Sequence, residues 1–202
     1  MYKLDEYEEL KRKYGSYGSW AVWRHNNESD TSVIDEHVEE LHSRFIFLGL
    51  NVSQSLGSAA WVNFHGGKHA RKLKYALNDT KLRGSYITDI FKDLPAPKSS
   101  DIVKILADDP SLITQNVEFF KREMADIRVT AESVFVVLGT PTSYISRYFR
   151  TYYHHNFSNL KFVNYYHYAY YALTDSTWVE GLWNELGVEA RYDHIRGMYT
   201  KE

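Results

Sequence analysis

The fold is decided by the stretch Arg44-Phe-Ile-Phe-Leu-Gly-Leu-Asn-Val-Ser53, in which an apolar run ends abruptly in small and polar residues. A short run of this kind, rich in apolar and aromatic residues, is typical of a buried strand. In an open α/β sheet, ligands gather outside the carboxyl ends of the strands. Asn51 lies just past the end of the run and is therefore the first candidate for a functional residue.

Three more short apolar runs indicate further strands of the same sheet. Together with the first run, the predicted strands are Phe45–Leu50, Tyr86–Phe91, Ser133–Leu138 and Leu160–Tyr165. Helical patterns alternate with them: Lys68–Leu77, a segment from Asp109-Pro110 with the apolar stripe Ile113, Val117, Phe120, Met124 and Ile127, a segment opened by Pro141, and a segment from Asp175 to Gly187. Such alternation favours a parallel sheet covered on both faces. We therefore expect a three-layer α/β/α fold with a central, mainly parallel four-stranded sheet.

A single domain is expected for residues 1–202, because a chain of this length can bury one substantial core. Residues 1–43 are an N-terminal extension of that domain. For the extension we predict a helix over Leu4–Lys13, a short strand over Ser19–Trp23 and a helix over Ser32–His42. We expect the segment Pro95–Ser100 to be a loop near the mouth of the site.

The composition excludes several classes of protein. The chain has no cysteine, so disulfides, thiolate metal sites and a cysteine nucleophile are excluded. No apolar run approaches the roughly 20 residues that span a bilayer, and the charged first residues are unlike a secretory leader. We therefore expect a cytoplasmic protein with no membrane partner.

Positive charge is concentrated in one part of the chain. The net charge of −2 does not suggest a strongly basic nucleic-acid binder, but six Lys or Arg lie between His65 and Arg83 against one acid, Asp79. A local patch of this kind can contact phosphates. The alternative is an ordinary solvated helix face.

The ends of the predicted strands bring polar and aromatic residues together. The polar residues are Asn51, Ser53, Gln54, Thr88, Asp89, Thr140, Thr142, Asn164 and His167. The aromatic residues are Phe64, Tyr165, Tyr166, Tyr168, Tyr170 and Tyr171. Hydrogen-bonding groups beside flat rings suit a planar heterocycle, because stacking holds its face while polar groups contact its edge. The alternative for the tyrosines is a role in the core or in an interface.

A resemblance to a known family extends over residues 44–187. It is carried by the segments Gly49-Leu-Asn-Val-Ser53, Phe64-His-Gly-Gly-Lys-His-Ala-Arg-Lys-Leu73, Gly84-Ser-Tyr-Ile-Thr-Asp-Ile-Phe-Lys-Asp-Leu-Pro95, Val134-Phe-Val-Val-Leu-Gly139 and Asn164-Tyr-Tyr-His-Tyr-Ala169. In this order and spacing they resemble the uracil-DNA glycosylase superfamily, especially its mismatch-specific uracil/thymine branch. The chain departs from that branch at Val52, where the branch has proline, and after His167, where Tyr-Ala replaces Pro-Ser. These departures argue against penetration of a DNA duplex more than against binding of a base.

The resemblance implies hydrolysis of the N-glycosidic bond of a uracil-like base, flipped out of single- or double-stranded DNA. It implies two catalytic residues, Asn51 to hold the water and His167 to donate to the departing base. The implied base-binding residues are Phe64, which stacks, and Thr88, Asp89 and Ser53, which contact polar atoms. The implied phosphate-binding residues are Lys68, Arg71 and Lys72. The protein would be a monomer.

We expect no metal and no cofactor. His65 and His69 are four residues apart and His154 and His155 are adjacent, but no third ligand stands at a suitable spacing. Two alternatives to a DNA glycosylase remain open. One is a catalytically degenerate nucleic-acid- or nucleotide-binding module on the same fold, and the other is an enzyme that acts on free nucleosides or nucleotides.

Overall fold

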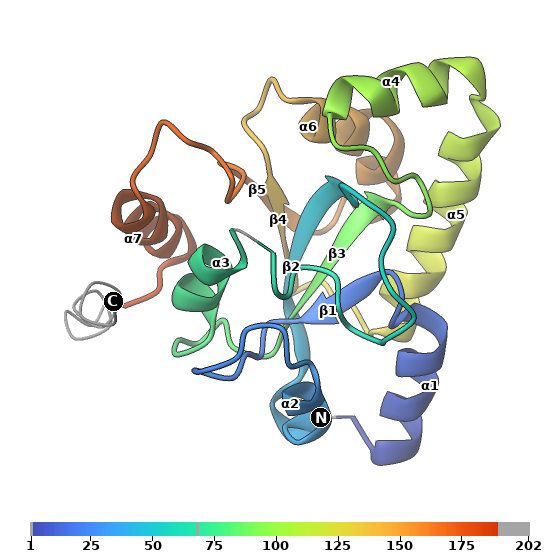
Figure 1. Ribbon diagram of the computed structural model, residues 1–202. Helices are drawn as coiled ribbons and strands as arrows, with labels where there is room; N and C mark the ends of the chain where they lie inside the picture. The colour runs from blue at the N-terminus through green and yellow to red at the C-terminus, as the bar shows by residue number, and fades with distance from the viewer. Residues whose placement is uncertain (1, 68, 190–202) are drawn as a thin grey trace.

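The computed structural model describes residues 2–67 and 69–189, which form a sheet covered by helices (Figure 1). The strands of this region are β1 (Gly18–Trp20), β2 (His42–Asn51), β3 (Ser85–Phe91), β4 (Val134–Leu138) and β5 (Lys161–Tyr165). Their order across the sheet is β1-β3-β2-β4-β5. The pairs β2–β3, β2–β4 and β4–β5 are parallel, and β1 is antiparallel to β3. The α/β class with a mainly parallel sheet is therefore confirmed.

The prediction of four strands is corrected to five, because a strand of the N-terminal segment joins the sheet. In β1, Gly18 pairs with Thr88 and Trp20 with Tyr86. The Trp20 ring lies 4.7 Å from the Tyr86 ring, and both side chains are wholly buried. Burial of these two aromatic surfaces is a strong driving force for pairing even so short a strand.

Two layers of helices enclose the sheet. The helices are α1 (Leu4–Tyr14), α2 (Ser32–Asp35), α3 (Ala70–Leu77), α4 (Ser99–Asp108), α5 (Ser111–Asp126), α6 (Tyr144–Tyr148) and α7 (Asp175–Leu186). Shorter turns are η1 (Val38–Glu40) and η3 (His154–Phe157), both 3-10, and η2 (Phe149–Tyr153), a π-helix. Helices α3 and α7 cover one face of the sheet, and α1, α4 and α5 lie on the other side (Figure 1). No helix of the described residues is long and apolar enough to cross a membrane.

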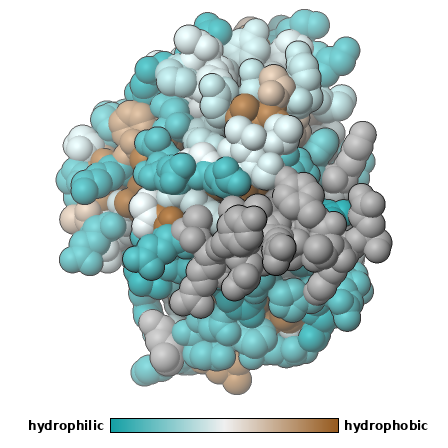
Figure 2. Space-filling model, turned by 90° about the vertical axis from the view of Figure 1, so that its left-hand side faces the viewer, coloured by the Kyte–Doolittle hydropathy of each residue, from teal (hydrophilic) through white to brown (hydrophobic). Residues whose placement is uncertain are grey.

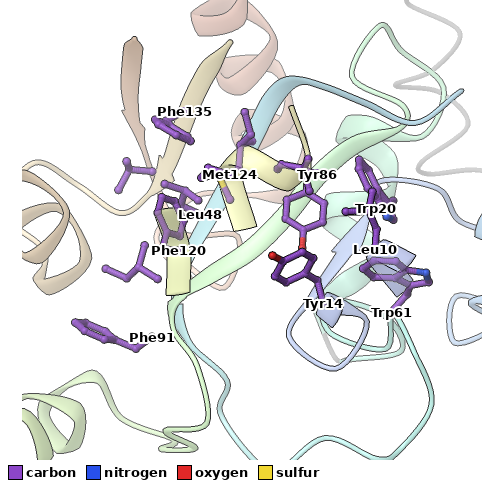
Figure 3. Packing of buried hydrophobic residues seen from close by; sticks show 14 of the residues in the cluster. Leu10, Tyr14, Trp20, Leu48, Trp61, Tyr86, Phe91, Phe120, Met124 and Phe135 are labelled. Atoms are coloured by element: carbon purple, nitrogen blue, oxygen red, sulfur yellow. The ribbon is translucent and has the colours of Figure 1, made fainter. Parts of the chain in front are cut away.

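Each face of the sheet has its own hydrophobic cluster. The cluster under α1, α4 and α5 includes Trp20, Leu48, Tyr86 and Phe120, part of which Figure 3 shows. The cluster under α3 and α7 includes Phe47 of β2 and other wholly buried side chains. Seen from the side of α3 and α7, the visible surface combines hydrophilic and neutral residues with scattered hydrophobic ones (Figure 2). This polar outer face is typical of the outer layer of an α/β/α fold.

The helix predicted over Ser32–His42 is wrong, because the segment is broken. Helix α2 ends after one turn, η1 follows, and His37 between them has φ −129° and ψ 36°, which is not helical. His42 already belongs to β2, where it pairs with Ser85. The end of the predicted helix therefore belongs to a strand, because pairing with β3 outweighs local helical propensity.

Capping residues set the ends of the helices, and the last helix has the predicted start and end. The segment opened by Pro141 becomes helical only at α6, where Ser143 is the N-cap and its Oγ accepts from the Ser146 N–H. The last helix has Thr174 as its N-cap, and Gly187 closes it with φ +59°. Helix α4, over Ser99–Asp108, was not predicted.

A buried ion pair attaches β3 to α5. Glu123 has no exposed surface, and the Lys92 ammonium lies 2.9 Å from its Oε2 and donates to its Oε1 at 3.2 Å. The hydroxyls of Tyr86 and Thr88 also donate to Glu123 Oε1, each at 2.9 Å. The Lys92 N–H donates to Asn116 Oδ1 at 2.6 Å. The end of β3 is thereby fixed to α5 by charged and polar contacts that are shielded from water.

We predict that Lys92→Met lowers the free energy of unfolding by about 3–5 kcal/mol, because it leaves Glu123 charged and buried without its cation. Urea denaturation at pH 7 measures the loss. The matched control is Lys121→Met, which breaks the exposed pair with Glu118 and should cost less than about 1 kcal/mol. The double substitution Lys92→Met with Glu123→Gln should recover much of the loss, since the amide oxygen still accepts from Tyr86 and Thr88. Equal losses in the Lys92 and Lys121 variants would contradict this account.

Candidate functional site

A cavity of about 770 Å³ opens at the carboxyl ends of the parallel strands. Ligand pockets commonly occupy about 300–1,000 Å³, so the cavity is large enough for a small organic ligand. Its walls come from the loops after β2, β3, β4 and β5 and include Asn51, Phe64 and His167. These three side chains, distant in sequence, therefore line one cavity. Ser53, Gln54 and the loop residues Ala96 and Pro97 line it as well.

The side-chain amide of Asn51 is held by backbone carbonyls. Its Nδ2 donates to the carbonyl oxygens of Val52 at 2.7 Å, Leu94 at 3.1 Å and Ala96 at 3.0 Å. Carbonyl oxygens only accept, so the amide nitrogen must face them and Oδ1 must face away. No described residue donates to Oδ1. Asn51 thus joins the loop after β2 to the loop after β3 and keeps one acceptor available to a ligand.

Asp89 is a buried carboxyl group in the wall of the cavity. It is 3 % exposed, and its Oδ2 accepts from Asn63 Nδ2 at 2.8 Å. Gly49 is its parallel partner in β2, and a Cβ atom at Gly49 would collide with Asp89 Oδ1. Only glycine leaves room for the carboxyl group here. Burial raises the pKa of Asp89 to about 6, an effect that the hydrogen bond from Asn63 and the charge of Lys92 partly offset.

Phe64 has an unusual backbone conformation. Its φ is +68°, in the left-handed region that a bulky side chain rarely adopts, at a cost of about 1–3 kcal/mol. The ring lies beside Gly49, with Cζ 3.3 Å from the position of a Cβ there, and it meets Tyr168 edge to face at 6.3 Å. Strain of this kind is concentrated at ligand sites. The left-handed backbone of Phe64 places its ring at the wall of the cavity, close to Asp89.

His167 is a neutral hydrogen-bond donor. Its Nδ1 accepts from the Ala169 N–H at 3.2 Å, so the ring proton is on Nε2. The imidazole stacks on Tyr168 with ring centroids 4.2 Å apart. Burial lowers the pKa of His167 to about 4, with smaller effects from nearby His69 and Lys72. At neutral pH the ring is therefore uncharged, and no described residue accepts from Nε2.

Thr88 is corrected, because it does not line the cavity. Successive residues of a strand face opposite sides, and Thr88 faces α5, where its hydroxyl donates to Glu123. It is wholly buried there, whereas its neighbour Asp89 faces the cavity. Asn63, which was not among the predicted site residues, orients the carboxyl group of Asp89. Its position one residue before Phe64 was the one available signal.

Lysines of the predicted basic patch are buried and form ion pairs within the protein. The Lys72 side chain is 5 % exposed, pairs with Asp175 at 2.9 Å and lies over the ring of Trp178. Lys74 is also buried and pairs with Glu28. Arg71 is exposed and donates to the Tyr75 hydroxyl at 3.0 Å, while Lys68 lies outside the described residues. Lys72 is therefore corrected from a phosphate ligand to a partner of α7.

The histidines of the cavity do not gather metal ligands. His65 is half-buried and stacks on the ring of Trp23, with centroids 4.9 Å apart, and desolvation of its imidazole lowers its pKa to about 4. Within residues 2–67 and 69–189, the one group that could meet at a metal ion is His37, Glu39 and Glu40, none of which lines the cavity. Glu40 there already pairs with Arg83. The chemistry of the cavity is that of amide, carboxyl, imidazole and aromatic groups.

Comparison of the chain with protein-family models, with curated proteins and with solved structures found no match. The functional interpretation therefore rests on the chemical groups that line the cavity.

We predict that Asp89→Asn stabilises the protein at high pH. The pKa of Asp89 is higher in the folded than in the unfolded state, so its contribution to stability is present below about pH 4 and is lost as pH rises through about 6. At pH 8 the variant should have a free energy of unfolding about 2–3 kcal/mol higher than the wild type. Urea denaturation from pH 4 to 8 measures this difference. Asp93→Asn removes an exposed carboxylate four residues away and should change stability little; the same gain in both variants would contradict the account.

Proposed function

We propose that the protein hydrolyses the N-glycosidic bond of a uracil-like base in DNA. The observation that supports this proposal is the single cavity lined by Asn51, Phe64 and His167, which offers an acceptor, a flat ring and a neutral donor. These are the side chains for which the sequence resembles the uracil-DNA glycosylase superfamily. The reaction needs each of the three groups.

Water attacks C1′ of the sugar as the C1′–N bond breaks, and the bonding electrons leave with the base. Asn51 Oδ1 accepts a hydrogen bond from this water and orients it toward C1′. The amide cannot rotate freely, because its nitrogen is held by three carbonyl oxygens. Orientation of the water before reaction lowers the entropic part of the barrier. An amide is a weak base, so the proton of the water passes to solvent and the reaction is slow.

The departing base takes up negative charge, which His167 stabilises. Its Nε2–H donates to a carbonyl oxygen of the base. The lowered pKa keeps the ring neutral at pH 7, with its proton on Nε2. A donor fixed toward developing negative charge contributes about 3–4 kcal/mol to the transition state.

Phe64 stacks on the face of the base, a contact that contributes about 1–3 kcal/mol. Its strained backbone holds the ring in place before the substrate arrives. Asp89 and Ser53, which line the same cavity, contact the polar edge of the base. The face and the edge of a planar ring are thus both contacted by the protein.

Exposed tyrosines beside the cavity support a nucleic-acid substrate. The rings of Tyr166 and Tyr170, both in the cavity wall, stack with centroids 4.8 Å apart. Tyr171 follows with its ring 5.9 Å from Tyr170, and it is 96 % exposed. Such rings stack on unpaired bases of a single strand.

A free nucleoside is the second candidate substrate. The pairing of Lys72 with Asp175 supports it, because this cation is already neutralised within the protein. A nucleoside needs the cavity alone and no phosphate contacts.

We predict that Asn51→Ala lowers the rate of abasic-site formation by roughly 100-fold or more, because the water loses its fixed acceptor. Uracil-containing single- and double-stranded oligonucleotides are incubated with the protein, and alkali then converts abasic sites to strand breaks. Asn184→Ala, on the exposed face of α7, is the control and should retain the wild-type rate.

The same assay separates the alternatives. Release of uracil from deoxyuridine without strand breaks supports the nucleoside enzyme. Salt-sensitive binding of the oligonucleotide without abasic product supports a binding module on this fold. Wild-type activity in Asn51→Ala would contradict the mechanism.

We predict that His167→Phe lowers kcat by about 10²–10³-fold, because a flat ring remains on Tyr168 but the donor to the departing base is lost. Single-turnover rates of uracil release measure the effect. The control is His155→Phe at an exposed position of η3, which should leave the rate unchanged. A loss confined to KM would mean that His167 contributes to binding alone.

A further inference from the structure

Tyr168 lines the cavity, and its ring contacts two of the side chains to which the proposed function gives a role. The ring stacks on the imidazole of His167, with centroids 4.2 Å apart and planes 29° apart. It also meets the Phe64 ring edge to face, with centroids 6.3 Å apart and planes 67° apart. Aromatic contacts therefore run without a break from Phe64 through Tyr168 to His167.

The loop that carries Tyr168 is fixed to helix α7 and to itself. The indole N–H of Trp178, a wholly buried residue of α7, donates to the Tyr166 carbonyl at 2.8 Å. The following residues form a turn in which the Tyr170 N–H donates to the His167 carbonyl at 2.8 Å. The backbone is therefore held on both sides of Tyr168.

The imidazole of His167 needs more than its own hydrogen bond to be oriented. The Ala169 N–H donates to its Nδ1 at 3.2 Å, which fixes the place of that nitrogen. One hydrogen bond does not fix the plane of the ring, because acceptors tolerate a broad range of angles. The Tyr168 ring restricts this tilt, since stacked aromatic pairs have preferred geometries. The direction in which the Nε2–H of His167 points therefore depends on Tyr168.

The Phe64 ring is restrained by the same residue. Phe64 and Tyr168 both pack against the hydrophobic cluster under α3 and α7. The left-handed backbone of Phe64 places its ring at the cavity wall but leaves rotation about the Cα–Cβ bond. The edge-to-face contact with Tyr168 limits that rotation.

The ring of Tyr168, rather than its hydroxyl, makes these contacts. The hydroxyl has no hydrogen-bond partner among residues 2–67 and 69–189. Burial, with a smaller effect from the charge of Asp89, raises the pKa of Tyr168 well above its ordinary value. The side chain is therefore uncharged at neutral pH, and a phenyl ring in its place should make the same contacts.

We propose that Tyr168 is a positioning residue, whose ring aligns the stacking ring of Phe64 and the hydrogen-bond donor of His167 for one bound base. The inference rests on the proposed function for the reaction that this alignment serves. Phe64 contacts the face of the base and His167 a carbonyl oxygen at its edge, so the two side chains must keep a fixed distance and angle. A misplacement of about 1 Å in such a site can lower the rate by about 100-fold.

The experiment compares two substitutions of Tyr168 in the full chain. Tyr168→Phe keeps the ring and should retain the wild-type rate of uracil release. Tyr168→Leu removes the ring and should lower the single-turnover rate by about 10–100-fold. The matched control is Tyr152→Leu, which removes a ring stacked on Tyr148 outside the cavity and should retain the wild-type rate.

Nuclear magnetic resonance of the His167 imidazole gives a second readout that does not need catalysis. In the wild type, burial lowers the pKa of His167 to about 4, with smaller effects from His69 and Lys72. Tyr168→Phe and Tyr152→Leu should leave this titration unchanged. In Tyr168→Leu one face of the imidazole gains water, so the pKa should rise toward its ordinary value of about 6.5.

The two readouts separate the inference from the hydrolase. If the wild type forms abasic sites, then a wild-type rate in Tyr168→Leu, equal losses in Tyr168→Phe and Tyr168→Leu, or a loss confined to KM would overturn the inference while the hydrolase stands. If the wild type forms none, the hydrolase is refuted and the titration decides. A His167 pKa that rises in Tyr168→Leu alone supports the positioning of His167, and an unchanged pKa overturns it. A wild-type His167 that titrates near its ordinary pKa of about 6.5 would overturn the inference even if Tyr168→Leu does not fold.

Discussion

The buried ion pair between Lys92 and Glu123 is the interaction on which the rest of the structure depends. It lies where β3 ends and α5 covers the sheet, and it also engages Tyr86 and Thr88. A charge buried as completely as Glu123 is tolerated only with its partner in place. By fixing the end of β3 from one face, the pair sets the position of Asp89 on the other face. A core interaction thereby determines the geometry of the cavity.

Three polar side chains of the cavity each form hydrogen bonds within the protein through one of their polar atoms. Among residues 2–67 and 69–189, Asn51 has its nitrogen bound and no donor to its oxygen, Asp89 has one oxygen bound, and His167 has one nitrogen bound. In each case the internal hydrogen bond orients the side chain and leaves another polar atom without a partner among the described residues. Such preorganisation has a cost in stability, which is visible in the raised pKa of Asp89 and in the left-handed backbone of Phe64.

Some features could not be anticipated from local patterns. Thr88 and Asp89 are neighbours of similar polarity, and alternation along a strand means that only one of them faces the cavity. Whether Thr88 or Asp89 faces the cavity depends on which face of the sheet α5 covers. Counting charges in the segment from His65 to Arg83 likewise could not reveal that Lys72 is buried against Trp178 and Asp175. The edge strand β1 is short, and its place depends on the distant aromatic ring of Tyr86.

The sequence by itself determined the parallel core of the sheet, the amphipathic helices α5 and α7, and the candidates Asn51, Phe64 and His167 at strand ends. These follow from periodicity and turn chemistry, which act between residues close in the chain. Tertiary structure alone decided that Asn63 orients Asp89, that Gly49 makes room for its carboxyl group, and that Lys92 neutralises Glu123. These contacts join residues far apart in sequence, and the energies of buried polar groups depend on which partners the fold places beside them.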